Sequence, residues 1–147
     1  QWTGAGAAGG LCGGLFGVLR SCGVKISVKN GIDYILERIG LSEKIKNCDL
    51  VITGEGQVDK QTKWGKAASG VVQMAKKQYG IASIVVVGSI GQGAFGLREE
   101  FGCEIFSIME KPVSLEEAMD NAEELLHKGA RRLFGIIQIG YKMNEKK

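Results

Sequence analysis

The sequence has few of the residues that build metal sites, disulfide frameworks or catalytic triads. Its 147 residues include one histidine, His127, and four scattered cysteines, Cys12, Cys22, Cys48 and Cys103. No two cysteines form a C-x-x-C pair, and a single histidine gives no zinc-binding spacing. We therefore predict reduced cysteines. No candidate nucleophile stands beside His127, which is predicted at the surface, so Ser-His-Asp and Cys-His hydrolase chemistry is excluded.

Long apolar runs and a large excess of positive or negative charge are also missing. No apolar run reaches the ~18 residues expected of a membrane span. A basic segment followed by a cleavage site, as in a secretory signal peptide, is not found. The net charge of +3 is small and evenly spread, which argues against nucleic acid or a membrane surface as a partner. The cytoplasm is therefore the expected location.

Glycine, in contrast, is abundant. The 23 glycines cluster in residues 4–17 and 88–96 without a fixed period, so they indicate loops and close backbone contacts. The length suits one domain or a piece of a larger protein. The chain begins at Gln1, without a methionine and directly before a glycine-rich motif. We therefore expect it to be a fragment.

Residues before position 48 have helical patterns. Small residues over 7–20 and apolar faces over 31–39 and 41–46 predict three helices, and Ser42 is the predicted cap of the last one. The glycines of the first helix disfavour helix formation, so we expect another group to approach its backbone closely.

After residue 48 the patterns of strands and helices alternate. Buried strands are predicted over 50–52, 84–87 and 104–109. Helices are predicted over 67–79, 96–101 and from a capping box at Ser114–Glu117 onward. This alternation implies right-handed crossovers and a parallel sheet, so the predicted fold class is α/β.

Residues 49–66, DLVITGEGQVDKQTKWGK, are the most informative segment. A buried strand is followed by a glycine-rich turn over 54–56, by Glu55 and Asp59, and by Lys66 at a helix start. Ligands in open α/β folds bind outside the carboxyl ends of parallel strands. Glycines let the backbone approach an anion, and a helix start offers unpaired N–H groups. The segment predicts an anion-handling site whose acids hold Mg²⁺ or accept a proton.

The same segment resembles the signature of the type I glycerate kinases, DLVITGEG-x-x-D-x-Q-T-x-x-GK. Further similarities occur at 4–10, 33–36, 40–41, 87–89, 106–108 and 114–118. The resemblance implies a Rossmann-like, three-layer α/β fold that is the C-terminal part of a longer, two-domain kinase. Residues 1–47 are then a glycine-rich helical segment of the second, inserted domain or of the inter-domain cleft. Residues 48–147 are the Rossmann-like segment.

The resemblance also implies ATP-dependent phosphorylation of D-glycerate with Mg²⁺. The catalytic candidates are Asp59, Glu55 and Lys66, and the two acids are also the candidate Mg²⁺ ligands, with their roles left undivided. The candidate substrate- and phosphate-binding residues are Gly4, Gly6, Gly9, Gly10, Thr53, Gly54, Gly56 and Gln61. The expected partners are D-glycerate, ATP, the missing N-terminal part of the parent chain and, in a homodimer, a second copy.

Two features keep alternatives open. Trp64 stands where many of these kinases have a histidine, so a catalytic role of that histidine is absent here, whereas tryptophan can take over a stacking or packing role. In addition, Gly91-x-Gly93-x-x-Gly96 follows a strand, and Glu110 comes about 20 residues later, as in a dinucleotide-binding fingerprint. The helix after Gly96 is short for that motif. The alternatives are therefore a dinucleotide-binding α/β module and a non-catalytic fragment.

Overall fold

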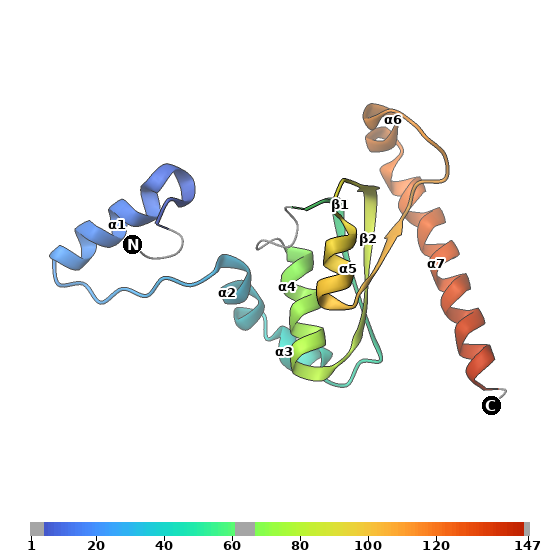
Figure 1. Ribbon diagram of the computed structural model, residues 1–147, viewed down its shortest axis with the longest axis horizontal. Helices are drawn as coiled ribbons and strands as arrows, with labels where there is room; N and C mark the ends of the chain where they lie inside the picture. Colours follow the sequence, from blue (N-terminus) through green and yellow to red (C-terminus); the bar gives the residue numbers. More distant parts are fainter. Residues whose placement is uncertain (1–4, 61–66, 146–147) are drawn as a thin grey trace. The chain divides into compact units, whose positions relative to one another are not determined.

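The computed structural model describes residues 5–60 and 67–145 (Figure 1). Two compact units are present, Gln1–Asn30 and Gly31–Lys147. The sequence also predicts a domain boundary after residue 47 in the longer kinase, and this boundary stays a prediction.

The first unit consists of a short 3-10 turn, η1 (Ala7–Gly10), followed by helix α1 (Leu11–Ser21). The sequence predicts one helix over 7–20, but the regular helix begins only at Leu11. The reason is that Ala8, Gly9 and Gly10 have φ values of 51°, 67° and 89°, which a right-handed helix does not allow. The glycine-rich motif is therefore a left-handed turn that leads into a helix.

The second unit begins with helices α2 (Gly31–Arg38) and α3 (Leu41–Ile45). The prediction that Ser42 caps α3 is wrong. The residue that precedes α3 is Gly40, in the left-handed conformation, and no side chain caps this end. The hydroxyl of Ser42 instead donates to the side-chain carbonyl of Gln78, 2.9 Å away, and so links α3 to the segment after α4.

The predicted parallel sheet is confirmed. It has three strands in the order β1 (Leu50–Val58), β2 (Ala82–Ile90) and β3 (Glu104–Ser107), and both pairs are parallel. The connections contain α4 (Ala67–Met74) with the short π-helix η2 (Ala75–Tyr79), and α5 (Phe95–Phe101). The glycines at 54–56, predicted as a turn, lie inside β1, because pairing with β2 continues as far as Val58 and Ile90.

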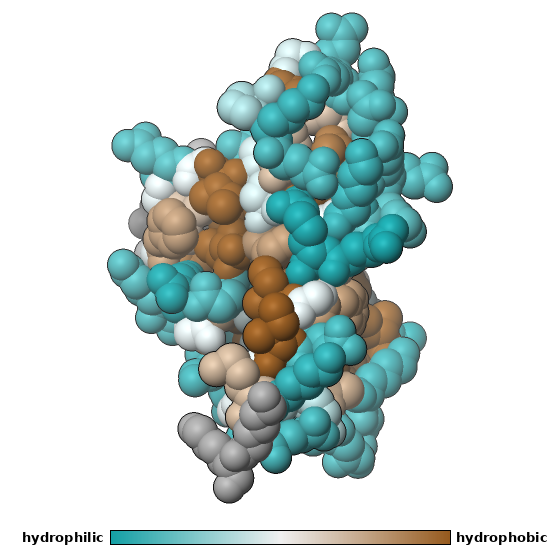
Figure 2. Space-filling model, turned by 90° about the vertical axis from the view of Figure 1, so that its right-hand side faces the viewer, coloured by the Kyte–Doolittle hydropathy of each residue, from teal (hydrophilic) through white to brown (hydrophobic). Residues whose placement is uncertain are grey.

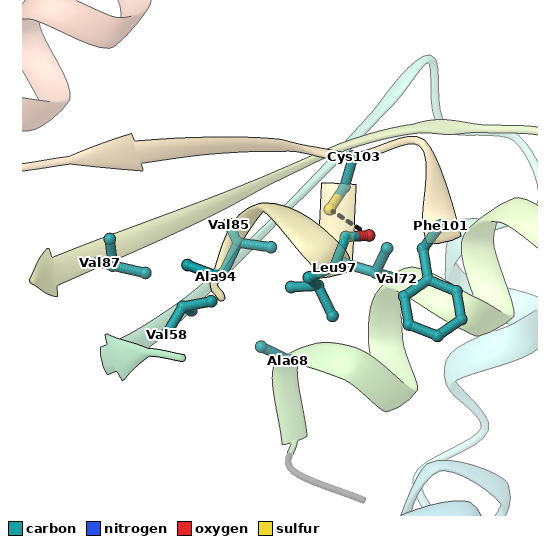
Figure 3. Packing of buried hydrophobic residues seen from close by; sticks show 9 residues of the cluster. All are labelled: Val58, Ala68, Val72, Val85, Val87, Ala94, Leu97, Phe101 and Cys103. Carbon is teal, nitrogen blue, oxygen red and sulfur yellow. Dashed lines mark hydrogen bonds between the residues drawn. The ribbon is translucent and has the colours of Figure 1, made fainter. Parts of the chain in front are cut away.

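One face of the sheet carries the larger hydrophobic core. Side chains from β1, β2, α4 and α5 pack there with the buried Cys103 (Figure 3). The cluster consists of Val58, Ala68, Val72, Val85, Val87, Ala94, Leu97, Phe101 and Cys103. The thiol of Cys103 donates to the carbonyl oxygen of Leu97 at 3.8 Å, and burial raises the pKa of this thiol. This core fixes the sheet against α4 and α5.

The C-terminal part has two helices, α6 (Leu115–Asp120) and α7 (Ala122–Asn144). The sequence predicts one long helix, but the two separate at Asn121, whose φ of −105° and ψ of 17° are not helical. The predicted cap is confirmed, since the Ser114 hydroxyl accepts from the Glu117 N–H at 3.1 Å. Helix α7 approaches the segment after β3 closely, because a Cβ atom on Gly129 would lie 2.8 Å from Ile108 Cγ2.

Candidate active site

The carboxyl ends of the strands border a cavity of about 1340 Å³. Residues 52–57 of β1 and 86–89 of β2 form one wall, and the segment 108–115 with α6 and α7 forms the other. The walls are mostly apolar, and the polar residues Thr53, Gln57 and Ser89 are among those that line the cavity. The lining includes Leu126 and Phe134 of α7, both more than half exposed. The cavity is therefore an open apolar face, which a ligand at the strand ends and another part of a longer protein can share.

Four of the predicted site residues line this cavity together: Thr53, Gly54, Glu55 and Gly56. Gly88 of β2 allows the two strands to approach closely here, since a Cβ atom on it would lie 2.8 Å from the Gly56 carbonyl oxygen, whereas a Cβ atom on Gly56 would meet nothing within 4 Å. The backbone of β1 is therefore open to a ligand at the point where the sequence predicts one.

Of these four residues, Glu55 is half-buried, and its carboxylate faces the start of α4, on the same face of the sheet as Val87 and not on the face toward α7. One of its carboxylate oxygens accepts a long hydrogen bond, 3.5 Å, from the backbone N–H of Ala68, in the first turn of that helix. A carboxylate at this position also interacts favourably with the positive end of the helix dipole. Glu55 thus connects the end of β1 to α4.

Asp59 comes directly after β1, and the backbone on each side of it is held by the segment after β2. The carbonyl oxygen of Val58 accepts a hydrogen bond of 2.7 Å from the Gly91 N–H. The N–H of Lys60 donates to the carbonyl oxygen of Gln92 at 3.1 Å. These contacts extend the pairing of the two strands beyond their ends and fix the place of Asp59.

Among the other predicted site residues, Asp59 does not line the cavity. Gly6, Gly9 and Gly10 belong to the first compact unit. The other three, Gly4, Gln61 and Lys66, lie outside the described residues, as does Trp64.

Sequence reasoning missed the role of Arg132 on α7. Its guanidinium donates to the carbonyl oxygen of Ile108 at 2.9 Å, lies 5.4 Å from the ring centre of Phe106, and pairs with a Glu110 carboxylate oxygen 3.8 Å away. These contacts hold α7 at the end of β3. No local pattern reveals them, because the partners are more than 20 residues apart in the sequence.

The described residues contain no group of three or more His, Cys, Asp and Glu side chains that could hold a metal ion. Within the same ranges, no helix is long and apolar enough to cross a membrane.

Comparisons with known proteins agree with the resemblance seen in the sequence. A model of the glycerate kinase family matches residues 1–138. The glycerate kinase of Halalkalibacterium halodurans is 40% identical over 130 residues, which are 88% of this chain and 33% of that protein. For the glycerate kinase of Bacillus cereus the identity is 36% over 136 residues, 92% of this chain and 34% of the relative.

The glycerate 2-kinase of Escherichia coli is 34% identical over 138 residues, which are 93% of this chain and 34% of that protein. The chain therefore spans about a third of the length of these curated relatives, and it matches their C-terminal part.

Proposed function

Because the chain belongs to the glycerate kinase family, we propose that a full-length protein containing it transfers a phosphoryl group from ATP to a hydroxyl group of D-glycerate. We call this protein the parent protein. The observation that carries the proposal is the family match over residues 1–138, and it is supported by Glu55 and Asp59 at the carboxyl end of a parallel strand.

Phosphoryl transfer requires the phosphates to be held, their charge to be neutralised and the acceptor hydroxyl to be oriented. Mg²⁺ usually binds through one or two carboxylates together with water and substrate phosphates. Two carboxylates, Glu55 and Asp59, fit this donor set. Bound Mg²⁺ would neutralise charge on the transferring phosphate. Asp59 is the acid that we place next to the metal ion or the acceptor hydroxyl.

The phosphates need N–H donors and positive charge. Lys66 and Gln61 are the candidates that follow β1 in the sequence. The glycine-rich turn of the first unit supplies a second candidate site, Gly4, Gly6, Gly9 and Gly10. Within this turn the Gly10 N–H donates to the Gly6 carbonyl oxygen at 3.2 Å, so the assignment rests on the glycine pattern and not on free N–H groups of the turn.

The parent protein is proposed to act in the cytoplasm, with the rest of its chain completing the site. The isolated chain covers about a third of its relatives, so we expect no glycerate kinase activity from it alone. Positioning of donor and acceptor contributes as much as ~7–11 kcal/mol to such reactions, and an incomplete site forfeits much of this.

Two contacts count against the dinucleotide-binding alternative. The Gly91 N–H is used by the Val58 carbonyl, and Glu110, the expected ribose ligand, pairs with Arg132. Titration of the parent protein with NAD and with ATP–Mg²⁺ separates the two functions, and we expect binding of ATP–Mg²⁺ alone.

The direct test is the Asp59→Asn variant of the parent protein, measured by ADP release with ATP–Mg²⁺ and D-glycerate. We expect a loss of about 10²–10⁴-fold, the usual contribution of a catalytic acid or base. Asp120→Asn, at an exposed aspartate of α6, is the matched control and should keep full activity. Full activity of Asp59→Asn would remove Asp59 from the site.

A further inference from the structure

The glycines of the dinucleotide-like motif have a different use in the structure. Gly91 and Gly93 lie in the loop after β2 and face the segment 58–60, which contains Asp59. The hydrogen bonds from the Gly91 N–H to Val58 and from the Lys60 N–H to Gln92 join the two segments on both sides of Asp59. We call the loop 91–93 the glycine clamp.

The close approach of the clamp requires glycine at position 91. A Cβ atom there would lie 2.8 Å from the side-chain nitrogen of Gln57, 3.0 Å from Asp59 Cβ and 3.3 Å from the Val58 carbonyl oxygen. The amide of Gln57 is at the end of a flexible side chain and can move away. The other two atoms belong to or adjoin the backbone of the Asp59 segment, so an added methyl group displaces that segment.

Position 93 requires glycine for two reasons. Its φ of 77° lies in the left-handed region, which other residues seldom adopt. A Cβ atom at this position would also lie 2.9 Å from Lys60 Cβ and 3.5 Å from Lys60 Cα. Any larger residue therefore moves the backbone that follows Asp59.

We infer that Gly91 and Gly93 are positioning residues for the kinase reaction, which act by holding Asp59 through the backbone of residues 58–60. This inference rests on the proposed function, since Asp59 is its candidate catalytic or metal-binding acid. A displacement of about 1 Å in a catalytic group can cost ~10²-fold in rate. Gly91→Ala and Gly93→Ala should therefore lower kcat by about 10–100-fold.

The test is a double-mutant cycle in the parent protein. If Gly91 acts through Asp59, Gly91→Ala lowers kcat when Asp59 is present and has no further effect in the Asp59→Asn background. A general loss of folding would lower kcat by the same factor in both backgrounds, and this result would overturn the inference. Gly31→Ala is the matched control, because a Cβ atom there meets nothing within 4 Å.

A second measurement needs no activity. Amide hydrogen exchange of the wild-type parent protein should show slow exchange at the N–H groups of Gly91 and Lys60, and both should exchange faster in Gly91→Ala or Gly93→Ala. Fast exchange at Lys60 in the wild type would contradict the clamp, even if no variant folds. A wild-type protein without turnover would instead refute the proposed function, and the exchange data would then decide the clamp on their own.

Discussion

The two faces of the sheet are built alike but covered differently. Strand residues alternate between the faces, so Val85 and Val87 point toward α4 and α5, whereas Ile84 and Val86 point to the other side. On the first face, Val85 and Val87 are at most 1% exposed. On the second, Ile52 of β1 is 40% exposed, and apolar residues of α7 remain in solvent.

The difference shows which part of the fold this chain completes by itself. Figure 2, viewed from the side of α7, shows hydrophobic residues at the surface between hydrophilic ones. The apolar residues of α7 that are more than half exposed are Leu126, Phe134, Ile136, Ile139, Tyr141 and Met143. Since the chain spans about a third of its relatives, we propose that the remaining part of the parent protein covers this second face.

The largest expected effect comes from two leucines that differ in burial. Leu97 in the covered core is 1% exposed, and Leu126 on α7 is 52% exposed. In urea unfolding of the isolated chain, Leu97→Ala should lower the free energy of unfolding by about 2–5 kcal/mol, the usual cost of truncating a buried leucine. Leu126→Ala should change it by no more than about 0.5 kcal/mol.

The same two variants, Leu97→Ala and Leu126→Ala, test in the parent protein whether the second face is covered. If the rest of the protein covers the second face, Leu126→Ala should lower the free energy of unfolding of the parent protein more than that of the isolated chain. The difference in unfolding free energy between the two variants then becomes smaller. An unchanged cost of Leu126→Ala in the longer protein would mean that this part of α7 stays in solvent.

A somewhat smaller effect is expected on self-association. The isolated chain should associate through its uncovered face, and Phe134→Ser should weaken this association. Burial of one phenylalanine side chain is worth about 1.5–3 kcal/mol, so Kd should rise by about 10–100-fold in sedimentation experiments. Phe95→Ser is the matched control, because Phe95 is 57% exposed, Phe134 is 58% exposed, and Phe95 lies on α5. Equal effects of the two variants would show that the second face is not the contact surface.

The sequence was sufficient for the fold class and for the element types. Continuous β-branched residues predicted β2, and the alternation of strands with helices predicted the parallel sheet, because both signals are local. The extent of β1 was not predictable, since glycines usually end a strand. Here Gly56 stays in the strand because pairing with β2 continues past it. The break at Asn121 also had no clear signal in a continuous apolar stripe.

For the candidate site, the sequence identified the acids but not their supports. Glu55 and Asp59 follow a strand and can be found by pattern. The link from Glu55 to Ala68 depends on how α4 packs, and the clamp around Asp59 depends on the spacing of β1 and β2. In the sequence Gly91 and Gly93 match a ligand-binding fingerprint, but only the three-dimensional structure shows that they lie against the Asp59 segment.

The smallest effect concerns Cys103, which belongs to the covered face. Burial raises the pKa of its thiol, so the folded protein keeps it protonated at a pH at which an unfolded chain begins to ionise it. The stabilisation is fully present below the unfolded pKa of about 8.5 and is lost as the pH rises through the folded pKa. One such group changes the free energy of unfolding by at most ~1.4 kcal/mol per pH unit. The decline of stability above pH 8.5 should therefore be less steep in Cys103→Ala than in the wild type, as measured by urea unfolding at several pH values.

The burial of Cys103 can also be tested by alkylation at pH 8, in which Cys103 should react far more slowly than the exposed Cys48. Similar rates for the two cysteines would show that the covered face opens readily, and the contrast between the two faces would then be much weaker than the structure indicates.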